Sequence, residues 1–153
     1  METLLLPHAF DECKPSILHH SRRRLPATPN MPKPTIEFTA IEEYPSTLSP
    51  SKELQTQVLS EDPQTGDKTV LLTHAKGSRW GEPTIQHEYW EECYILEGRL
   101  YDERTSQWYG PGNYCCRPPD VKHGPFVADH EEGCREIAWV RFPRRSEEIM
   151  KVK

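Results

Sequence analysis

The sequence contains few hydrophobic residues and no long apolar run. Hydrophobic residues make up 35% of the 153 residues, and the mean hydropathy is -0.80. The longest apolar run near the N-terminus, Leu4-Leu5-Leu6, stops at Pro7 and follows no basic residue. Such a run is too short for the apolar core of a signal peptide and for a membrane span. We therefore expect a soluble, cytoplasmic protein with a single core that does not act at a membrane.

The chain also lacks an excess of basic residues. Its formal net charge at pH 7 is -5 and its pI is near 5.8, so it offers no broad positive field to nucleic acid or to an anionic membrane surface. The triplet Arg22-Arg23-Arg24 is interpreted as a solvated surface stretch, with a nucleic-acid or targeting patch as the alternative. The expected partner is a small-molecule substrate rather than nucleic acid.

Cysteine spacing argues against two kinds of small scaffold. The five cysteines are odd in number and show no CxxC spacing. This spacing indicates neither a disulfide framework nor a structural zinc ribbon. We interpret the cysteines as reduced, mostly buried thiols.

Proline, by contrast, is abundant, with 15 residues, many of them towards the N-terminus. Proline fixes φ and removes a backbone donor, so residues 1–67 should form neither long helices nor central strands. We expect this segment to be an extended N-terminal arm that packs on a core or on a partner subunit, with short edge strands near residues 35–39 and 54–59. A barrel over residues 68–145 and a tail over residues 146–153 would follow it.

From Lys68 onward, short β-type runs alternate with turns that contain glycine or proline. The runs cover Lys68–His74, Thr84–Leu96, Leu100–Asp102, Gln107–Tyr109, Tyr114–Arg117, Gly124–Ala128 and Cys134–Phe142. The residues between the first two runs include a glycine-containing turn over 77–81. Many short strands at this spacing predict an all-β sandwich or barrel.

One run places two metal-ligating side chains on the same face. In an extended strand successive side chains alternate faces, so His87, Tyr89, Glu91 and Cys93 share one face of the run over Thr84–Leu96. An imidazole and a carboxylate that point into the same space are ligands for divalent metals. Cys93 is interpreted as a small core residue. By itself this pair of ligands is a weak indication of a metal site.

A second segment strengthens the indication through a resemblance to the cupin superfamily. That superfamily carries the motifs Gly-x5-His-x-His-x3-4-Glu-x6-Gly and Gly-x5-Pro-x-Gly-x2-His. The matching stretches here are Glu91-x6-Gly98 and Gly112-x5-Pro118-x-Asp120-x2-His123. The resemblance implies a cupin-type β-barrel, also called a double-stranded β-helix or jelly roll, with the N-terminal arm attached to it.

In detail the chain resembles the cupin-like zinc-binding domain of bacterial anti-sigma factors. The corresponding stretches are Glu91-Glu92 followed by Leu96-Glu97-Gly98, Pro118-Pro119 before His123, and Glu132-Gly133-Cys134. It is also similar to small cupin dioxygenases, which share the same barrel. The resemblance further implies a homodimer, which the arm could form by exchange.

One departure from the anti-sigma pattern affects the ligand set. In that pattern a His-x-His pair precedes the glutamate; here His87 matches the second histidine and Ile85 replaces the first. The resemblance therefore implies three ligands, His87, Glu91 and His123. Two imidazoles and one carboxylate leave coordination positions open, as in non-haem Fe(II) oxygenases, whereas structural zinc sites have four ligands. We expect Fe(II), with Zn, Mn or Ni as alternatives; a weakened site without metal is the other interpretation.

Two further residues are candidates for catalysis. Tyr89 shares the inward face and could hydrogen-bond a substrate or simply fill the barrel. If Cys134, Glu136 and Ala138 face inward, Glu136 is a buried carboxylate and a candidate general base. The alternation also allows Trp139 and its neighbours to face inward, which we slightly favour. Arg117 is interpreted as a structural ion-pair partner, with binding of an anionic substrate as the alternative. Four other histidines fall outside the motif spacing and are interpreted as surface or loop residues: His19, His20, His74 and His130.

Three functions fit these observations. The first is a metal-dependent Fe(II) dioxygenase that acts on an enolisable, aromatic or polyketide-like substrate. The second is a non-redox lyase, isomerase or cyclase that stabilises an enolate in the barrel pocket. The third is a zinc- or ligand-binding sensor module that acts through a protein partner, although the proline-rich arm is unlike a helical regulatory domain. A fold alone does not choose among them.

Overall fold

A computed structural model describes residues 33–144, which form two antiparallel β-sheets. The larger sheet has six strands in the order β1 (Ser46–Leu48), β2 (Leu54–Glu61), β3 (Lys68–His74), β10 (Cys134–Arg141), β5 (Trp90–Gly98) and β8 (Tyr114–Arg117). The smaller sheet has four strands in the order β4 (Arg79–Trp80), β9 (Phe126–Ala128), β6 (Leu100–Asp102) and β7 (Gln107–Tyr109). A short 3-10 helix, η1, covers Ile41–Glu43. The all-β prediction is confirmed.

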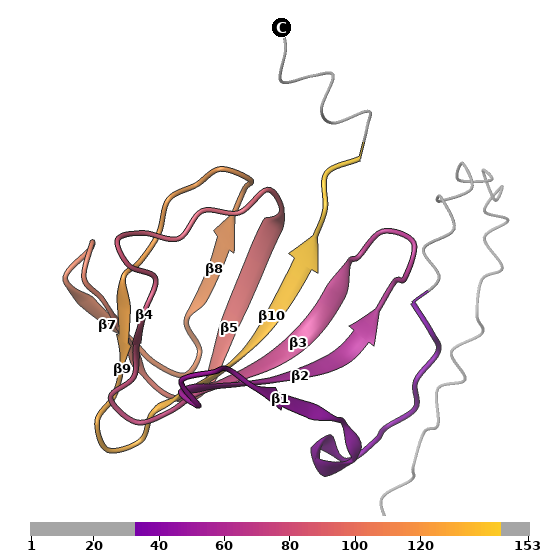
Figure 1. Ribbon diagram of the computed structural model, residues 1–153, viewed down its shortest axis with the longest axis horizontal. Helices are drawn as coiled ribbons and strands as arrows, with labels where there is room; N and C mark the ends of the chain where they lie inside the picture. The colour runs from indigo at the N-terminus through magenta and orange to yellow at the C-terminus, as the bar shows by residue number, and fades with distance from the viewer. Residues whose placement is uncertain (1–32, 145–153) are drawn as a thin grey trace, which may run out of the picture. The chain divides into compact units, whose positions relative to one another are not determined.

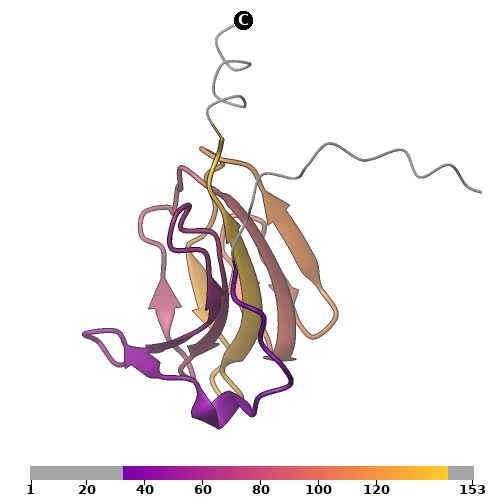
Figure 2. The same cartoon turned by 90° about the vertical axis from the view of Figure 1, so that its right-hand side faces the viewer.

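The two sheets face each other across an apolar interior. Figure 1 shows β4, β9 and β7 opposite β5 and β8, and in the perpendicular view of Figure 2 the long strands of the larger sheet run side by side. Five buried side chains from both sheets form one cluster: Ile95, Leu100, Phe126, Ala128 and Cys134. Burial of these side chains holds the sheets together. The described residues contain no helix with the length and apolar character needed to cross a bilayer.

Most of the predicted strands form with the expected residues. The runs expected at 68–74, 100–102, 107–109 and 114–117 are β3, β6, β7 and β8. The strand expected near 54–59 is β2, but it lies between β1 and β3 rather than at the edge of the sheet. No strand forms at 35–39, where that prediction was wrong, because β1 takes the edge position and leaves this segment without a pairing partner among residues 33–144.

The long run over residues 84–96 is a strand only from Trp90. Its pairing with β8 ends where Glu91 lies opposite Arg117. Pro118 follows directly, and proline has no N–H to continue the ladder. Residues 84–89 are therefore not part of β5. A further strand that was not expected, β4, lies within the predicted turn at 77–81.

Glycines of the sequence motifs allow two turns to pack against each other. Gly98 and Gly133 have positive φ values of 64° and 76°. A Cβ atom at Gly98 would collide with the Gly133 carbonyl oxygen, and one at Gly133 would lie 2.6 Å from the His74 carbonyl oxygen. Only glycine fits such close backbone approaches. The turns after β5 and before β10 therefore meet at the end of the barrel.

Asp120 also has a left-handed backbone, with φ at 70°. It stands where the cupin motif usually has glycine, and aspartate is among the residues that tolerate this conformation. The departure from the motif therefore preserves the turn. The tail at 146–153 and residues 1–32 of the expected arm lie outside the described residues, and with them the arginine triplet, Cys13 and the pair His19-His20.

Candidate metal centre

Two loops bring His87 and His123 together. The Ile85 amide donates to the His123 carbonyl oxygen at 2.8 Å, and the His123 amide donates to the Ile85 carbonyl oxygen at 3.1 Å. The Asp120 amide donates to the His87 carbonyl oxygen at 2.8 Å. His87 thus reaches the site from a loop held by the turn after Pro118, and not from a strand as the alternation argument assumed.

Glu91 is the second residue of strand β5, and its carboxylate lies between the two imidazoles. Its Oε1 lies 3.5 Å from His87 Nε2, and its Oε2 lies 3.4 Å from His123 Nε2. The ligand atoms of His87, Glu91 and His123 all lie within 4.8 Å of one another. Ligands bound at metal–nitrogen and metal–oxygen distances of about 2.1 Å on one face of an octahedron are about 3 Å apart. The three ligand atoms are of the right kind and close enough together that these residues could hold a metal ion.

The tautomer of His123 is fixed by its backbone. His123 Nδ1 lies 3.0 Å from the Val121 carbonyl oxygen, and because a carbonyl only accepts, Nδ1 carries the proton and Nε2 has a free lone pair. Burial lowers the pKa of His123 below its ordinary value, against the opposing effect of this hydrogen bond. The effect of burial is the larger, so the imidazole is neutral, and its Nε2, which lies near Glu91, has the lone pair that binds a metal.

Tyr89 packs against the ligand His87 rather than into the barrel interior. The two rings stack with centroids 4.4 Å apart, and the other side of Tyr89 meets Phe142 edge-on at 5.3 Å. Burial, followed by the negative charge of Glu91, raises the pKa of the phenol. The ring of Tyr89 therefore holds the plane of His87, which favours a positioning role.

Glu136 faces inward and is paired with His74. Both Glu136 and His74 are buried, and Glu136 Oε1 lies 3.1 Å from His74 Nε2. The His74 ring also stacks on Trp80, with centroids 3.9 Å apart. The preference for Trp139 on the inward face was wrong, because Trp139 is exposed while the small residue Ala138 is buried. Alternation along β10 allows either face to point inward, and the structure buries the face that carries Cys134, Glu136, Ala138 and Val140.

The reading of His74 as a surface or loop residue was also wrong. His74 ends strand β3 with the same parity as Val70 and Leu72, and the side chains on that face point into the barrel. This parity is visible in the sequence and could have identified His74. His130, in contrast, is exposed in a loop as expected.

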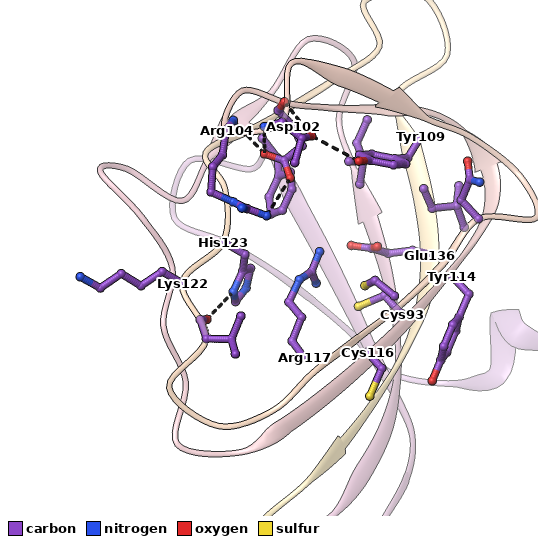
Figure 3. A pocket seen from close by; sticks show the side chains of 17 residues that line it. Cys93, Asp102, Arg104, Tyr109, Tyr114, Cys116, Arg117, Lys122, His123 and Glu136 are labelled. Atoms are coloured by element: carbon purple, nitrogen blue, oxygen red, sulfur yellow. Dashed lines mark hydrogen bonds and ion pairs between the residues drawn. The ribbon is translucent and has the colours of Figure 1, made fainter.

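The three candidate metal ligands line one cavity of the barrel, and His123 also lines a second. The smaller, of about 200 Å³, is lined by His87, Glu91, His123 and the His74–Glu136 pair, among others. The larger, of about 360 Å³, is lined by residues of β6, β7 and β8 among others (Figure 3). Six residues line both: Cys93, Leu100, Arg117, His123, Phe126 and Glu136. A small organic molecule in the larger cavity would be next to the metal ligands.

The cysteines largely follow the expectation of reduced thiols. Cys93 and Cys134 are buried, Cys115 is half-buried and Cys116 is exposed, and these four cysteines of residues 33–144 are free. Cys93 lies directly opposite Cys115 in the β5–β8 ladder. It packs with Val70 and Ala138, as expected for a core residue.

Comparisons with known structures show the same fold. RemF, a polyketide cyclase from Streptomyces resistomycificus, is 21% identical over 72% of this chain and 82% of its own, with a TM-score of 0.57. An acetylacetone dioxygenase from Acinetobacter johnsonii is 14% identical over 74% of this chain and 82% of its own, with a TM-score of 0.54. At these identities the likeness concerns the fold alone. No curated protein sequence is significantly similar to the chain.

The comparisons also include a structure with an anti-sigma factor, the group whose cupin-like domain the sequence resembles. The complex of Rhodobacter sphaeroides SigE with the anti-sigma ChrR contains a chain that is 20% identical over 65% of this chain and 51% of its own, with a TM-score of 0.51. Residues 35–140 match the family model of the ChrR cupin-like domain. Because this match covers more than half of the chain, the protein belongs to the ChrR cupin-like domain family and has the cupin-type β-barrel that its sequence motifs implied.

Proposed function

We propose that this chain is a metal-dependent enzyme that acts on a small enolisable organic substrate, and that it is an Fe(II) dioxygenase. The observation that carries the proposal is the set of three ligands, His87, Glu91 and His123, beside an internal cavity. Two imidazoles and one carboxylate with open positions are the ligand set of non-haem Fe(II) oxygenases. When bound, the metal would supply Lewis acidity and O2 activation.

The chain's own residues would move the proton. Glu136 lines both cavities and would take the proton from a C–H next to a substrate carbonyl. The electron pair of that C–H bond would remain on the substrate as an enolate, and the proton would pass to a Glu136 oxygen. An N–H at His74 Nε2 donates to Glu136 Oε1 and holds the carboxylate in place. Tyr89 would act through His87 by fixing its ring plane.

A non-redox isomerase, lyase or cyclase is the second candidate. The specific observation in its favour is the buried His74–Glu136 pair, because proton transfer through this pair needs no oxidant. A sensor module is the third candidate, and membership of the ChrR cupin-like domain family supports it. All three use the same metal ligands and differ in the metal and in turnover.

Metal analysis of the purified protein tests the proposal. The full-length protein would be purified without chelators, its metals quantified, and O2 uptake measured after anaerobic loading with Fe(II) and addition of β-dicarbonyl compounds. Iron with O2 uptake supports the dioxygenase, a redox-inert metal with turnover supports the second candidate, and zinc without turnover supports the sensor. His87→Ala and His123→Ala should lose the metal, whereas His130→Ala, an exposed control, should keep it. Unchanged metal content in both ligand variants would contradict the site itself.

A further inference from the structure

Arg117 ends strand β8 directly opposite Glu91, at the boundary between the two cavities. Its Nη1 donates to Glu91 Oε2 at 2.8 Å, and its guanidinium lies over the Phe126 ring, 5.5 Å from the centroid. Within residues 33–144, this is the single hydrogen bond that its side chain makes. A guanidinium has five N–H donors in a planar fork, so most of the Arg117 donors are unused.

The unused donors are accessible from the cavities. Arg117 lines both of them, and its side chain is 20% exposed. The buried polar side-chain atoms of residues 33–144 that have no partner belong to Asp62 and Ser78, so no Arg117 nitrogen is sealed in without a partner. Figure 3 shows the Arg117 guanidinium reaching into the pocket between His123 and Glu136. A ligand in the larger cavity can therefore meet these donors.

The charges around the larger cavity would favour an anion once a metal is bound. Arg104, Arg117 and Lys122 are the cations among its lining residues. Arg104 is paired with Asp102 at 3.9 Å, and Arg117 with Glu91 at 2.8 Å. The carboxylates of the cavity already have partners in the fold. Asp102 Oδ1 accepts the amides of Arg104 and Thr105 at 2.9 and 3.3 Å, and Glu136 is held by His74. A divalent metal on two neutral imidazoles and Glu91 would bring the positive charges around the cavity into excess over the negative ones, so the metal-loaded cavity would favour an anion.

The rest of the lining indicates what kind of anion fits. Apolar side chains of Ile95, Leu100 and Phe126 cover one wall of the cavity. A guanidinium fork matches a planar carboxylate with two parallel hydrogen bonds. A phosphate dianion would be repelled more strongly than a carboxylate by Asp102 and Glu136, which also line the cavity, because it carries more negative charge.

We propose that Arg117 binds a carboxylate group of the substrate, so that the substrate is a small organic acid with an apolar body. This inference rests on the proposed function, because the ligand is a substrate only if the chain is an enzyme. It makes Arg117 a specificity-determining residue. Its Glu91 ion pair fixes the guanidinium, and its remaining donors hold the carboxylate next to the metal ligands.

Ligand binding to the full-length protein loaded with zinc, which is redox-inert, tests the proposal. Isothermal titration calorimetry would compare benzoate, its neutral analogue benzamide, and phenyl phosphate. We expect benzoate to bind at least about tenfold more tightly than benzamide, because an ionic hydrogen-bonded pair in a desolvated pocket is worth that much. Arg117→Gln should abolish this preference, and Arg117→Lys should restore part of it because the charge returns without the fork.

The matched control is Arg135→Gln, which removes an arginine paired with Glu97 on the outer face of the same sheet. It should leave the preference unchanged. Equal or weaker binding of benzoate relative to benzamide by the wild-type protein would overturn the proposal without any variant, and so would a preference that survives Arg117→Gln. Tighter binding of phenyl phosphate than benzoate would overturn the choice of a carboxylate. The same titration on metal-free protein separates the two proposals, because the carboxylate preference can persist when metal binding fails.

Discussion

Ile85 and His123 exchange both of their backbone hydrogen bonds, with N–O distances of 2.8 and 3.1 Å. In an antiparallel pair of this kind the two side chains lie side by side on the same face. Ile85 therefore lies next to a metal ligand and lines the same cavity. The position that carries a histidine in the anti-sigma pattern is spatially intact, and what differs is the side chain.

Replacing Ile85 with histidine should complete a four-ligand site. We expect Ile85→His to bind zinc at least about tenfold more tightly, since each added ligand in a preformed site strengthens binding. The measurement is competition with a chromophoric chelator. The same variant should lose O2-dependent turnover, because a coordination position is filled. Ile85→Val is the matched control, and equal zinc affinity in the two variants would contradict the placement of this side chain.

The buried pair of His74 and Glu136 should be important for stability as well as for chemistry. His74→Ala leaves the Glu136 carboxylate buried without its partner, which we expect to lower the free energy of unfolding by about 3 kcal/mol. The double variant His74→Phe, Glu136→Leu should be less destabilised than the sum of its single variants. Urea denaturation measures both. Additive single effects would show that the two side chains do not interact.

The two motif glycines Gly98 and Gly112 should differ in their tolerance of alanine. Both have positive φ, but a Cβ at Gly98 would collide with the Gly133 carbonyl, whereas a Cβ at Gly112 meets no atom within 4 Å. We expect Gly112→Ala to cost about 1 kcal/mol from backbone strain alone, and Gly98→Ala to cost clearly more, about 3 kcal/mol or above. Thermal denaturation compares the two. Equal costs would mean that the turns after β5 and before β10 are not in contact.

Cys115 should be the most reactive cysteine inside the barrel. A hydrogen bond from the Cys93 thiol, helped by the charge of Arg117 and opposed by burial, lowers the pKa of Cys115 to about 7. Burial, followed by the charge of Glu136, raises the pKa of Cys134 to about 12. In a Cys116→Ser background, the rate of alkylation by iodoacetamide at Cys115 should rise through about pH 7 and level off above it, while Cys134 stays unmodified. Peptide mass spectrometry measures both sites.

The direction of the associated stability change follows from the same shift. The folded-state pKa of Cys115 lies below its ordinary value of 9.0, so between these values the unfolded chain binds the extra proton. The contribution of Cys115 to stability therefore rises from pH 7 to pH 9 and is lost as the pH falls through 7. Cys93→Ala removes the hydrogen-bond donor and should move the alkylation midpoint upward. A midpoint that stays in place would assign the shift to Arg117 instead.

The sequence by itself was sufficient to predict the barrel, the family and the three residues that could hold a metal ion. Short runs with period two fixed the strands from Lys68 onward, because each strand encodes which of its faces is apolar. The glycines and the Pro118-Pro119 corner could be recognised because backbone conformation is a local property. Alternation also predicted that Glu91 shares a face with Cys93 and Ile95, and both of these residues are buried.

Only the tertiary structure decided which distant side chains meet. His87 reaches the site through the pairing of Ile85 with His123, residues 38 positions apart, and not through strand alternation. His74 meets Glu136, and Arg117 meets Glu91, because neighbouring strands adopt one particular register. A strand pattern specifies a face but not a partner strand. The face of β10 was misjudged because alternation defines two faces without saying which one points inward, and the structure buries the face of Cys134, Glu136, Ala138 and Val140.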